Sequence, residues 1–112
     1  MNSVQFGLYR DLIAGIDEQY LVTTLKEMVA IRSENPFQEE PRAGFREKEM
    51  GDYFAEAMNS AGFQVESREV KPGRPNVFGL KKGSTGTSSL MLCGHLDTAR
   101  TDGYAEAYRI DE

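Results

Sequence analysis

Apolar positions three and four residues apart predict helices in the first half of the chain. A weak pattern over residues 6–13 predicts a short helix ending near residue 15, after which Asp17 can cap the next helix. A stronger stripe predicts an amphipathic helix over residues 18–32, with most of its apolar residues on one face. An Asn-Pro step ends this helix, and a polar loop follows over residues 37–44.

The hydrophobic period changes from helical to alternating after a further helix. That helix is predicted over residues 46–61, with Gly62 as the left-handed residue that follows its end. Alternating polar and apolar residues then predict a half-exposed strand over 63–70 and, after a turn, a second short strand over 76–80. A loop rich in Gly, Ser and Thr follows over 81–88.

The most apolar stretch of the chain comes next. Residues 90–93 (LMLC) are apolar on both sides of an extended chain, which is typical of a strand buried inside an α/β sheet. His95 and Asp97 come directly after it, where polar chemistry collects beyond the carboxyl ends of such strands. Their spacing places both side chains on the same side of an extended chain.

The predicted fold class is therefore α/β. After the short first helix, the order is helix, helix, strand, strand, buried strand. A strand that is apolar on both faces needs helices on each side and strands on each edge, and the other elements supply only part of this. We expect residues 1–112 to be the N-terminal fragment of a single larger domain, with no second domain present.

The composition of the chain argues against some classes of binding partner. The chain has 13 Lys and Arg against 18 Asp and Glu, a net charge of −5, and its basic residues are scattered among acids. This argues against nucleic acid as a partner. No apolar run approaches the roughly 20 residues of a membrane span, and the N-terminus lacks the features of a signal peptide. The single cysteine fits a reducing compartment, so we expect a cytoplasmic protein with neither a nucleic-acid nor a membrane partner.

The His-x-Asp pair is the main candidate for chemistry. A neutral imidazole is a good zinc ligand, and a nearby carboxylate can fix its tautomer and orientation. On spacing alone, such a histidine is more often a hydrogen-bonded structural residue, and a catalytic zinc site needs at least three protein ligands. The acids after the pair have no fixed metal-ligand spacing and are as readily explained as surface residues: Asp102, Glu106, Asp111 and Glu112.

Three other chemistries fit the sequence less well. Cys93 and His95 would form a nucleophile and base only if the chain turned between them. The loop at 82–88 lacks the Gly-Lys-Ser/Thr ending of a phosphate cradle and precedes a strand rather than a helix. A serine hydrolase would need a Gly-x-Ser-x-Gly elbow, which the sequence does not contain.

Longer segments carry a family resemblance. Residues 73–80 (GRPNVFGL), the Gly/Ser loop and residues 90–98 (LMLCGHLDT) resemble the zinc amidohydrolase and aminopeptidase-like family of acetylornithine deacetylase, succinyl-diaminopimelate desuccinylase, aminoacylase and carboxypeptidase G. The helix end LKEMVAIRS with its Asn-Pro step is similar to the same family, as are the helix start EMGDYF and the following AGF. The resemblance covers about residues 17–104, and Gly-His-x-Asp-Thr is its most specific part.

The resemblance implies a mixed-sheet α/β/α zinc-peptidase-like domain, here incomplete. His95 matches the family's first metal-ligand histidine, and Asp97 matches the catalytic-site aspartate that supports this imidazole. The general-base glutamate and the other ligands of the family lie further along than residue 112. The sequence departs from the family at Ala99-Arg100, where members often have small apolar residues and proline.

The implied cofactor is a pair of Zn²⁺ ions, with Co²⁺ as a substitute. The implied reaction is hydrolysis of the amide bond of an N-acyl amino acid or small peptide by a full-length protein that forms homodimers. The isolated 112-residue chain is expected to be inactive, because one ligand cannot hold a catalytic metal. The alternative is a truncated, non-catalytic binding or folding module without a metal.

Overall fold

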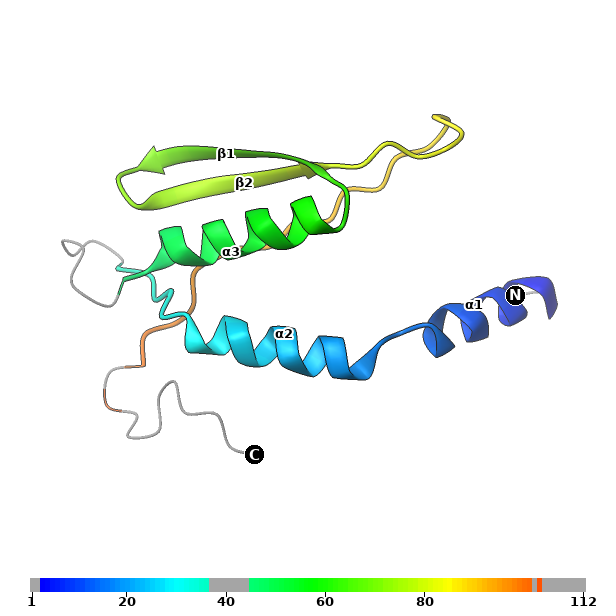
Figure 1. The fold of residues 1–112 in the computed structure, drawn as a ribbon, viewed down its shortest axis with the longest axis horizontal. Helices are drawn as coiled ribbons and strands as arrows, with labels where there is room; N and C mark the ends of the chain where they lie inside the picture. The colour runs from blue at the N-terminus through cyan, green and yellow to red at the C-terminus, as the bar shows by residue number, and fades with distance from the viewer. Residues whose placement is uncertain (1–2, 37–44, 102, 104–112) are drawn as a thin grey trace.

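The computed structural model describes residues 3–36, 45–101 and 103, and these form a small α/β structure (Figure 1). Within them, three helices precede one antiparallel pair of strands. The elements in chain order are α1 (Ser3–Ala14), α2 (Glu18–Ala30), α3 (Glu47–Ser60), β1 (Gln64–Lys71) and β2 (Arg74–Leu80). The α/β class is confirmed, whereas the loop predicted over residues 37–44 lies outside the described residues.

Local sequence signals set the helix ends. The side chain of Asp17 accepts a hydrogen bond of 2.9 Å from the backbone N–H of Tyr20, which caps α2. Gly62 has a φ of +80° and donates its N–H to the carbonyl of Asn59, as expected of the residue that follows a helix. The three predicted helices are confirmed: α2 and α3 begin and end within two residues of the predicted limits, and α1 begins three residues before the predicted pattern.

The two predicted strands, β1 and β2, are confirmed, and they pair as an antiparallel hairpin. Its turn contains Pro72 and Gly73, and Gly73 has a φ of +75°, a combination typical of a type II turn. The backbone N–H of Gly73 donates a hydrogen bond of 2.7 Å to Glu69. The pairing register shifts between Glu69 and Lys71, so the turn joins the strands through a bulge.

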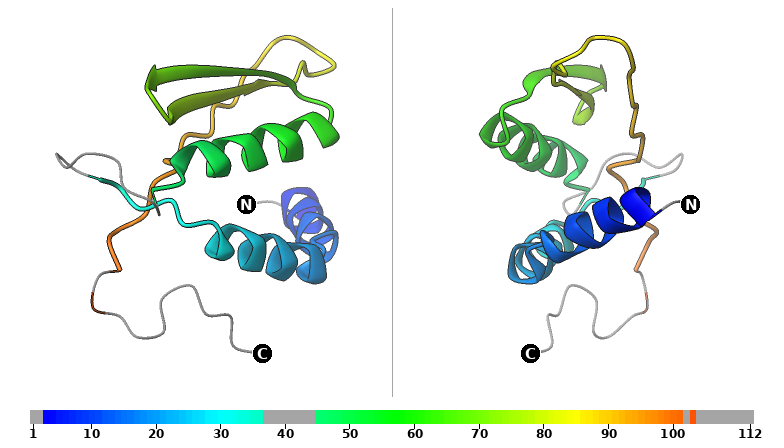
Figure 2. Two further views of the ribbon diagram at one scale, coloured as in Figure 1. Left: turned by 60° about the vertical axis from the view of Figure 1, so that its left-hand side comes forward. Right: turned by 90° about the vertical axis from the view of Figure 1, so that its right-hand side faces the viewer.

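A small core lies between α3 and the hairpin, where α3 covers one face of the two strands (Figures 1 and 2). Met50 of α3 is 3% exposed, and Gly51 and Pro75 are buried beside it. A Cβ atom on Gly51 would lie only 2.7 Å from Cγ of Pro75. The missing side chain of Gly51 therefore lets helix and strand approach closely.

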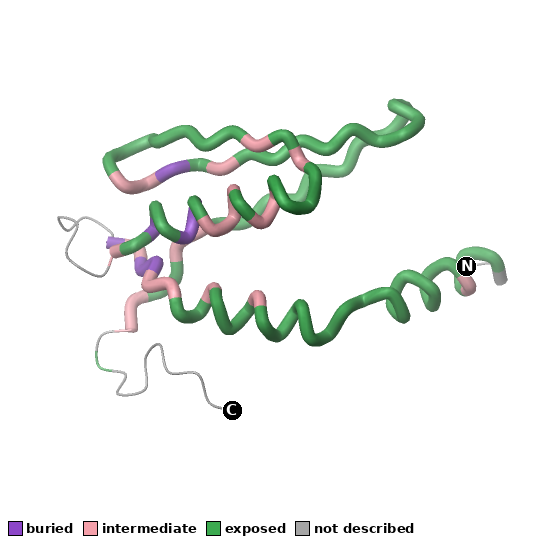
Figure 3. Tube along the Cα trace, in the orientation of Figure 1, coloured by how far each residue is buried: buried purple, intermediate pink, exposed green. Residues whose placement is uncertain are grey.

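The first two helices stay outside this core. No residue of α2 is buried, and Leu21 and Leu25 in its apolar stripe are 60% and 58% exposed. Figure 3 shows α1 and α2 as largely exposed, with buried positions gathered where the chain leaves α2 and enters α3. The stripe of α2 is confirmed as helical, and its apolar face is exposed among the described residues.

The predicted buried strand is wrong. Residues 90–94 form no strand, and Leu90, Met91 and Leu92 are 85%, 86% and 86% exposed. This segment runs apart from the paired strands (Figures 1 and 2), so among the described residues it has no neighbouring strand and no helix on either face. Apolar character alone does not form a strand, because the backbone also needs a hydrogen-bonding partner.

No helix in the described parts of the chain has the length and apolar character needed to cross a membrane.

Candidate metal site around His95 and Asp97

The candidate site forms where two distant segments of the chain meet. The backbone N–H of Thr98 donates to the carbonyl of Ser33 at 2.9 Å, and the N–H of Asn35 donates to the carbonyl of Thr98 at 3.0 Å. Glu34 and Thr98 thereby form a short parallel bridge. These bonds place the residues that follow α2 beside the His-x-Asp segment.

A buried acid reinforces this junction. Glu34 is 2% exposed, and its carboxylate accepts hydrogen bonds from the backbone N–H of Thr101, at 3.1 Å, and from the Thr101 hydroxyl. The guanidinium of Arg32 lies 3.6 Å from the same carboxylate. A buried carboxylate needs such partners to offset its lost hydration. Glu34 was not predicted as a site residue, because its partners are distant in sequence and leave no periodic signal.

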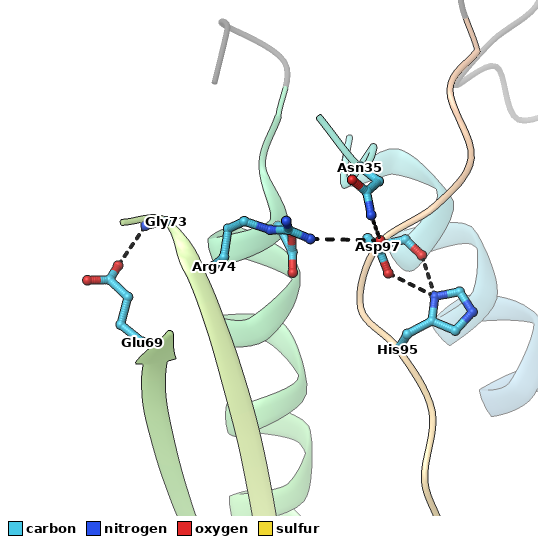
Figure 4. A network of polar contacts seen from close by, with 7 residues as sticks. Asn35, Glu69, Gly73, Arg74, His95 and Asp97 are labelled. Atoms are coloured by element: carbon cyan, nitrogen blue, oxygen red, sulfur yellow. Dashed lines mark hydrogen bonds and ion pairs between the residues drawn. The ribbon is translucent and has the colours of Figure 1, made fainter. Parts of the chain in front are cut away.

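His95 and Asp97 contact each other across a bend at Leu96, whereas the sequence predicted only that both side chains lie on the same side of an extended chain. Nδ1 of His95 lies 2.7 Å from the backbone carbonyl of Asp97 and 3.0 Å from its Oδ1 (Figure 4). Both oxygens accept hydrogen bonds, so they favour the tautomer with hydrogen on Nδ1. The side chain of His95 is 83% exposed, and Nε2 is then the nitrogen available to a ligand.

The surroundings shift the pKa of both groups. The backbone carbonyl of Asp97, and then its carboxylate, raise the pKa of His95 above its ordinary value by accepting hydrogen bonds from the imidazole. Burial by itself would raise the pKa of Asp97, but hydrogen bonds from Asn35 and His95 stabilise the charged form and lower the pKa overall. Asp97 therefore remains a carboxylate at neutral pH.

Two further side chains meet Asp97 from other elements. The amide Nδ2 of Asn35 donates to Oδ2 of Asp97, and Nη2 of Arg74, at the start of β2, lies 3.9 Å from that oxygen (Figure 4). Arg74 is held by Glu47, in the first turn of α3, through an ion pair of 2.6 Å. Asn35 and Arg74 lay within the segments that carry the family resemblance, but neither was predicted as a site residue.

The imidazole of His95, held by Asp97, fits the role of one ligand in a zinc site. An exposed imidazole whose other nitrogen binds a carboxylate is the usual arrangement of a zinc-binding histidine. Among the described residues, no three His, Cys, Asp or Glu side chains form a group that could hold a metal ion. The acids Asp102, Glu106, Asp111 and Glu112 lie outside those residues.

Two hollows on the surface of the described residues lie away from this site. One, of about 580 Å³, lies between α2 and α3 and is lined in part by Tyr20, Glu27 and Tyr53. Another, of about 240 Å³, is lined by residues of α3 and the hairpin, including Glu47 and Arg74. Neither is lined by His95, so the candidate site is an exposed side chain rather than a closed pocket.

Comparison with known proteins adds no assignment. The chain matches no protein-family model, no curated protein and no solved structure. The case for a metal site therefore rests on the geometry of His95 and Asp97 and on the sequence resemblance described above.

Proposed function

We propose that this chain is the N-terminal part of a zinc-dependent amide hydrolase that acts on N-acyl amino acids or small peptides. The observation that carries the proposal is the contact between His95 and Asp97: Asp97 occupies Nδ1 and leaves Nε2 to face solvent. The Gly-His-x-Asp-Thr sequence, which resembles that family, supports the same assignment.

In this proposal, each of the two residues has a distinct role. His95 supplies one metal ligand through Nε2, and Asp97 orients the imidazole and raises its basicity as a ligand. The bound metal supplies polarisation of the amide carbonyl and a water of lowered pKa. One imidazole cannot hold a catalytic metal, so the remaining ligands come from residues other than those that the structure describes.

The exposed apolar surface supports the placement of this chain within a larger domain. Leu21 and Leu25 on α2 and the Leu90–Met91–Leu92 run are each more than half exposed. Exposed apolar side chains gathered in this way on one segment ordinarily mark a contact with other protein. A central sheet and covering helices would bury both the stripe of α2 and the run at residues 90–92.

The test is hydrolysis by the complete product of the reading frame that encodes these residues. With Zn²⁺ or Co²⁺, it should release free amino acid from N-acyl amino acids, and His95→Ala should lower kcat/KM by about 100-fold or more, because a ligand is lost. Cys93→Ala is the matched control: Cys93 is exposed two residues before His95, and its loss should leave the rate unchanged.

Two outcomes would contradict the proposal. Loss of activity in Cys93→Ala, with His95→Ala still active, would favour a thiol nucleophile. A complete product that neither binds metal nor hydrolyses any N-acyl amino acid or peptide would favour the non-catalytic module. The exposed apolar surface would then be its binding face.

A further inference from the structure

The two carboxylate oxygens of Asp97 have different partners (Figure 4). Oδ1 lies 3.0 Å from Nδ1 of His95, whereas Oδ2 accepts a hydrogen bond from the side-chain amide of Asn35. A carboxylate is planar, so a donor that fixes Oδ2 also fixes the direction in which Oδ1 faces the imidazole. Asn35 therefore acts on His95 through Asp97, without touching the imidazole.

The backbone places Asn35 independently of its side chain. Its N–H donates to the carbonyl of Thr98 at 3.0 Å, and the N–H of Thr98 donates to the carbonyl of Ser33 at 2.9 Å. These bonds put residue 35 beside Asp97 whatever side chain it carries. A substitution at Asn35 can thus remove the amide donor while the junction persists.

Arg74 approaches the same oxygen but restrains it less. Its Nη2 lies 3.9 Å from Oδ2 of Asp97, beyond hydrogen-bonding distance, and its Nε pairs with Glu47 at 2.6 Å. The positive charge of Arg74 favours the ionised form of Asp97 without fixing the rotation of the carboxylate. Of these two side chains, Asn35 is thus the one whose hydrogen bond restrains the rotation of the Asp97 carboxylate.

We propose that Asn35 is a positioning residue, which holds Oδ2 of Asp97 so that Oδ1 and the backbone carbonyl keep the hydrogen of His95 on Nδ1. Without this amide, the carboxylate rotates more freely and the imidazole returns towards the Nε2–H tautomer that histidine favours in water. That tautomer has hydrogen on the nitrogen assigned to the metal. This last consequence rests on the proposed function, whereas the effect on the tautomer does not.

The experiment reads the tautomer directly. The chain contains one histidine, so the imidazole nitrogen-15 shifts report on His95 alone. At a fixed alkaline pH at which the imidazole is neutral, the full 112-residue chain should show mainly the Nδ1–H tautomer. In Asn35→Ala, the ratio of Nδ1–H to Nε2–H should fall about threefold or more. Asn35→Asp is nearly isosteric and should lower this ratio at least as far, because the new carboxylate repels that of Asp97 and donates no hydrogen bond.

Matched controls separate positioning from general loosening. Asn59→Ala removes the same side chain from an exposed position on α3 and should leave the tautomer ratio unchanged. The amide signals of β1 and β2 should match those of the original chain in every variant. An unchanged ratio in both Asn35 variants, with these signals intact, overturns the proposal. So does an equal change in Asn59→Ala.

Titration with Co²⁺, followed by the His95 signals, tests the positioning role of Asn35 separately from the proposed function. Co²⁺ added to the chain should shift the His95 signals, weakly because the described residues supply no group of three ligands. About tenfold more metal should be needed in Asn35→Ala. Asn35 substitutions that change the tautomer, with no Co²⁺ effect on His95 in any variant, support the positioning role and overturn the metal-ligand assignment. Tight stoichiometric Co²⁺ binding at His95, with an unchanged tautomer in both Asn35 variants, overturns the positioning role alone.

Discussion

Asp97 is partly removed from water and still keeps its charge. Its side chain is 21% exposed, and burial alone would favour the neutral acid. Donors on both oxygens reverse this preference, because hydrogen bonds from Asn35 and His95 stabilise the carboxylate. The remaining charge and the backbone carbonyl of Asp97 together bind the imidazole.

We expect the pKa of His95 to lie above that of a free histidine, because the protonated imidazole donates to the backbone carbonyl and the carboxylate of Asp97. A pH titration of the single histidine signal by NMR measures it. Since the folded pKa is the higher one, this contact adds stability below the ordinary pKa of histidine and loses it as the pH rises through the folded pKa. Asp97→Asn should lower the pKa, whereas Asp52→Asn, on the exposed face of α3, should not. A pKa that is equal in the original chain and in Asp97→Asn would contradict the structure.

Which contacts between residues can be predicted from the sequence depends on how far apart the two residues lie along the chain. His95 and Asp97 could be expected near each other in advance because they are two residues apart, although their contact also needs the bend at Leu96. Asn35 could not, since it is 62 residues from Asp97 and only the pairing of Ser33, Asn35 and Thr98 brings it there. Glu34 and Thr101 are separated in the same way, by 67 residues.

The residues at which the helices and strands begin and end are determined by sequence features within a few residues of those ends. Asp17 caps α2, Gly62 follows α3, and Pro72 with Gly73 turns β1 into β2. Each of these operates through local backbone geometry and was therefore readable in advance. The packing of α3 on β2 was not, because it depends on the absence of a side chain at Gly51 facing Pro75.

Two helical glycines should respond in opposite ways to substitution by alanine. Alanine gains about 1 kcal/mol of helix propensity over glycine. At Gly7 in α1, an added Cβ meets nothing within 4 Å, so Gly7→Ala should raise the helical signal in circular dichroism without loss of stability. At Gly51, the Cβ would lie 2.7 Å from the rigid ring of Pro75, and overpacking of this kind costs about 1–3 kcal/mol.

Gly51→Ala should therefore lower the free energy of unfolding in urea, despite the gain in propensity. Gly79→Ala in β2 is a graded comparison: its Cβ would meet Sδ of Met58 at 2.6 Å, in a side chain that can move aside. The loss there should be smaller than at Gly51. Equal stabilisation by Gly7→Ala and Gly51→Ala would mean that α3 and β2 do not approach as closely as described.

As a whole, the molecule is more open than its length suggests. Its radius of gyration is 17.6 Å, whereas a compact domain of this length has about 13 Å. The core joins α3 to the hairpin, and the polar junction around Glu34 ties the end of α2 to the segment at residues 97–101. Most other apolar side chains, including those of α1, face outward.

Stability should consequently depend on few apolar residues. Met50 is 3% exposed, so Met50→Ala should lower the free energy of unfolding by about 2 kcal/mol or more. Leu92 is 86% exposed, so Leu92→Ala should change it by less than about 0.5 kcal/mol. Urea denaturation followed by circular dichroism measures both. A large loss in Leu92→Ala would show that residues 90–93 are buried after all, as the sequence pattern predicted.

The sequence by itself determined the helices, the two strands, their caps and turns, and the closeness of His95 to Asp97, because each depends on residues close together along the chain. Only the tertiary structure decided which apolar residues are buried. The run at residues 90–92 is as apolar as a core strand, yet it is exposed, and no strand of the described part of the chain lies beside it. Only the tertiary structure brought Asn35 and Arg74 to Asp97, since backbone pairing and packing between distant segments place them there. Short segments of sequence determine local backbone geometry. Burial and contacts between distant residues depend on which helices, strands and loops pack against each other.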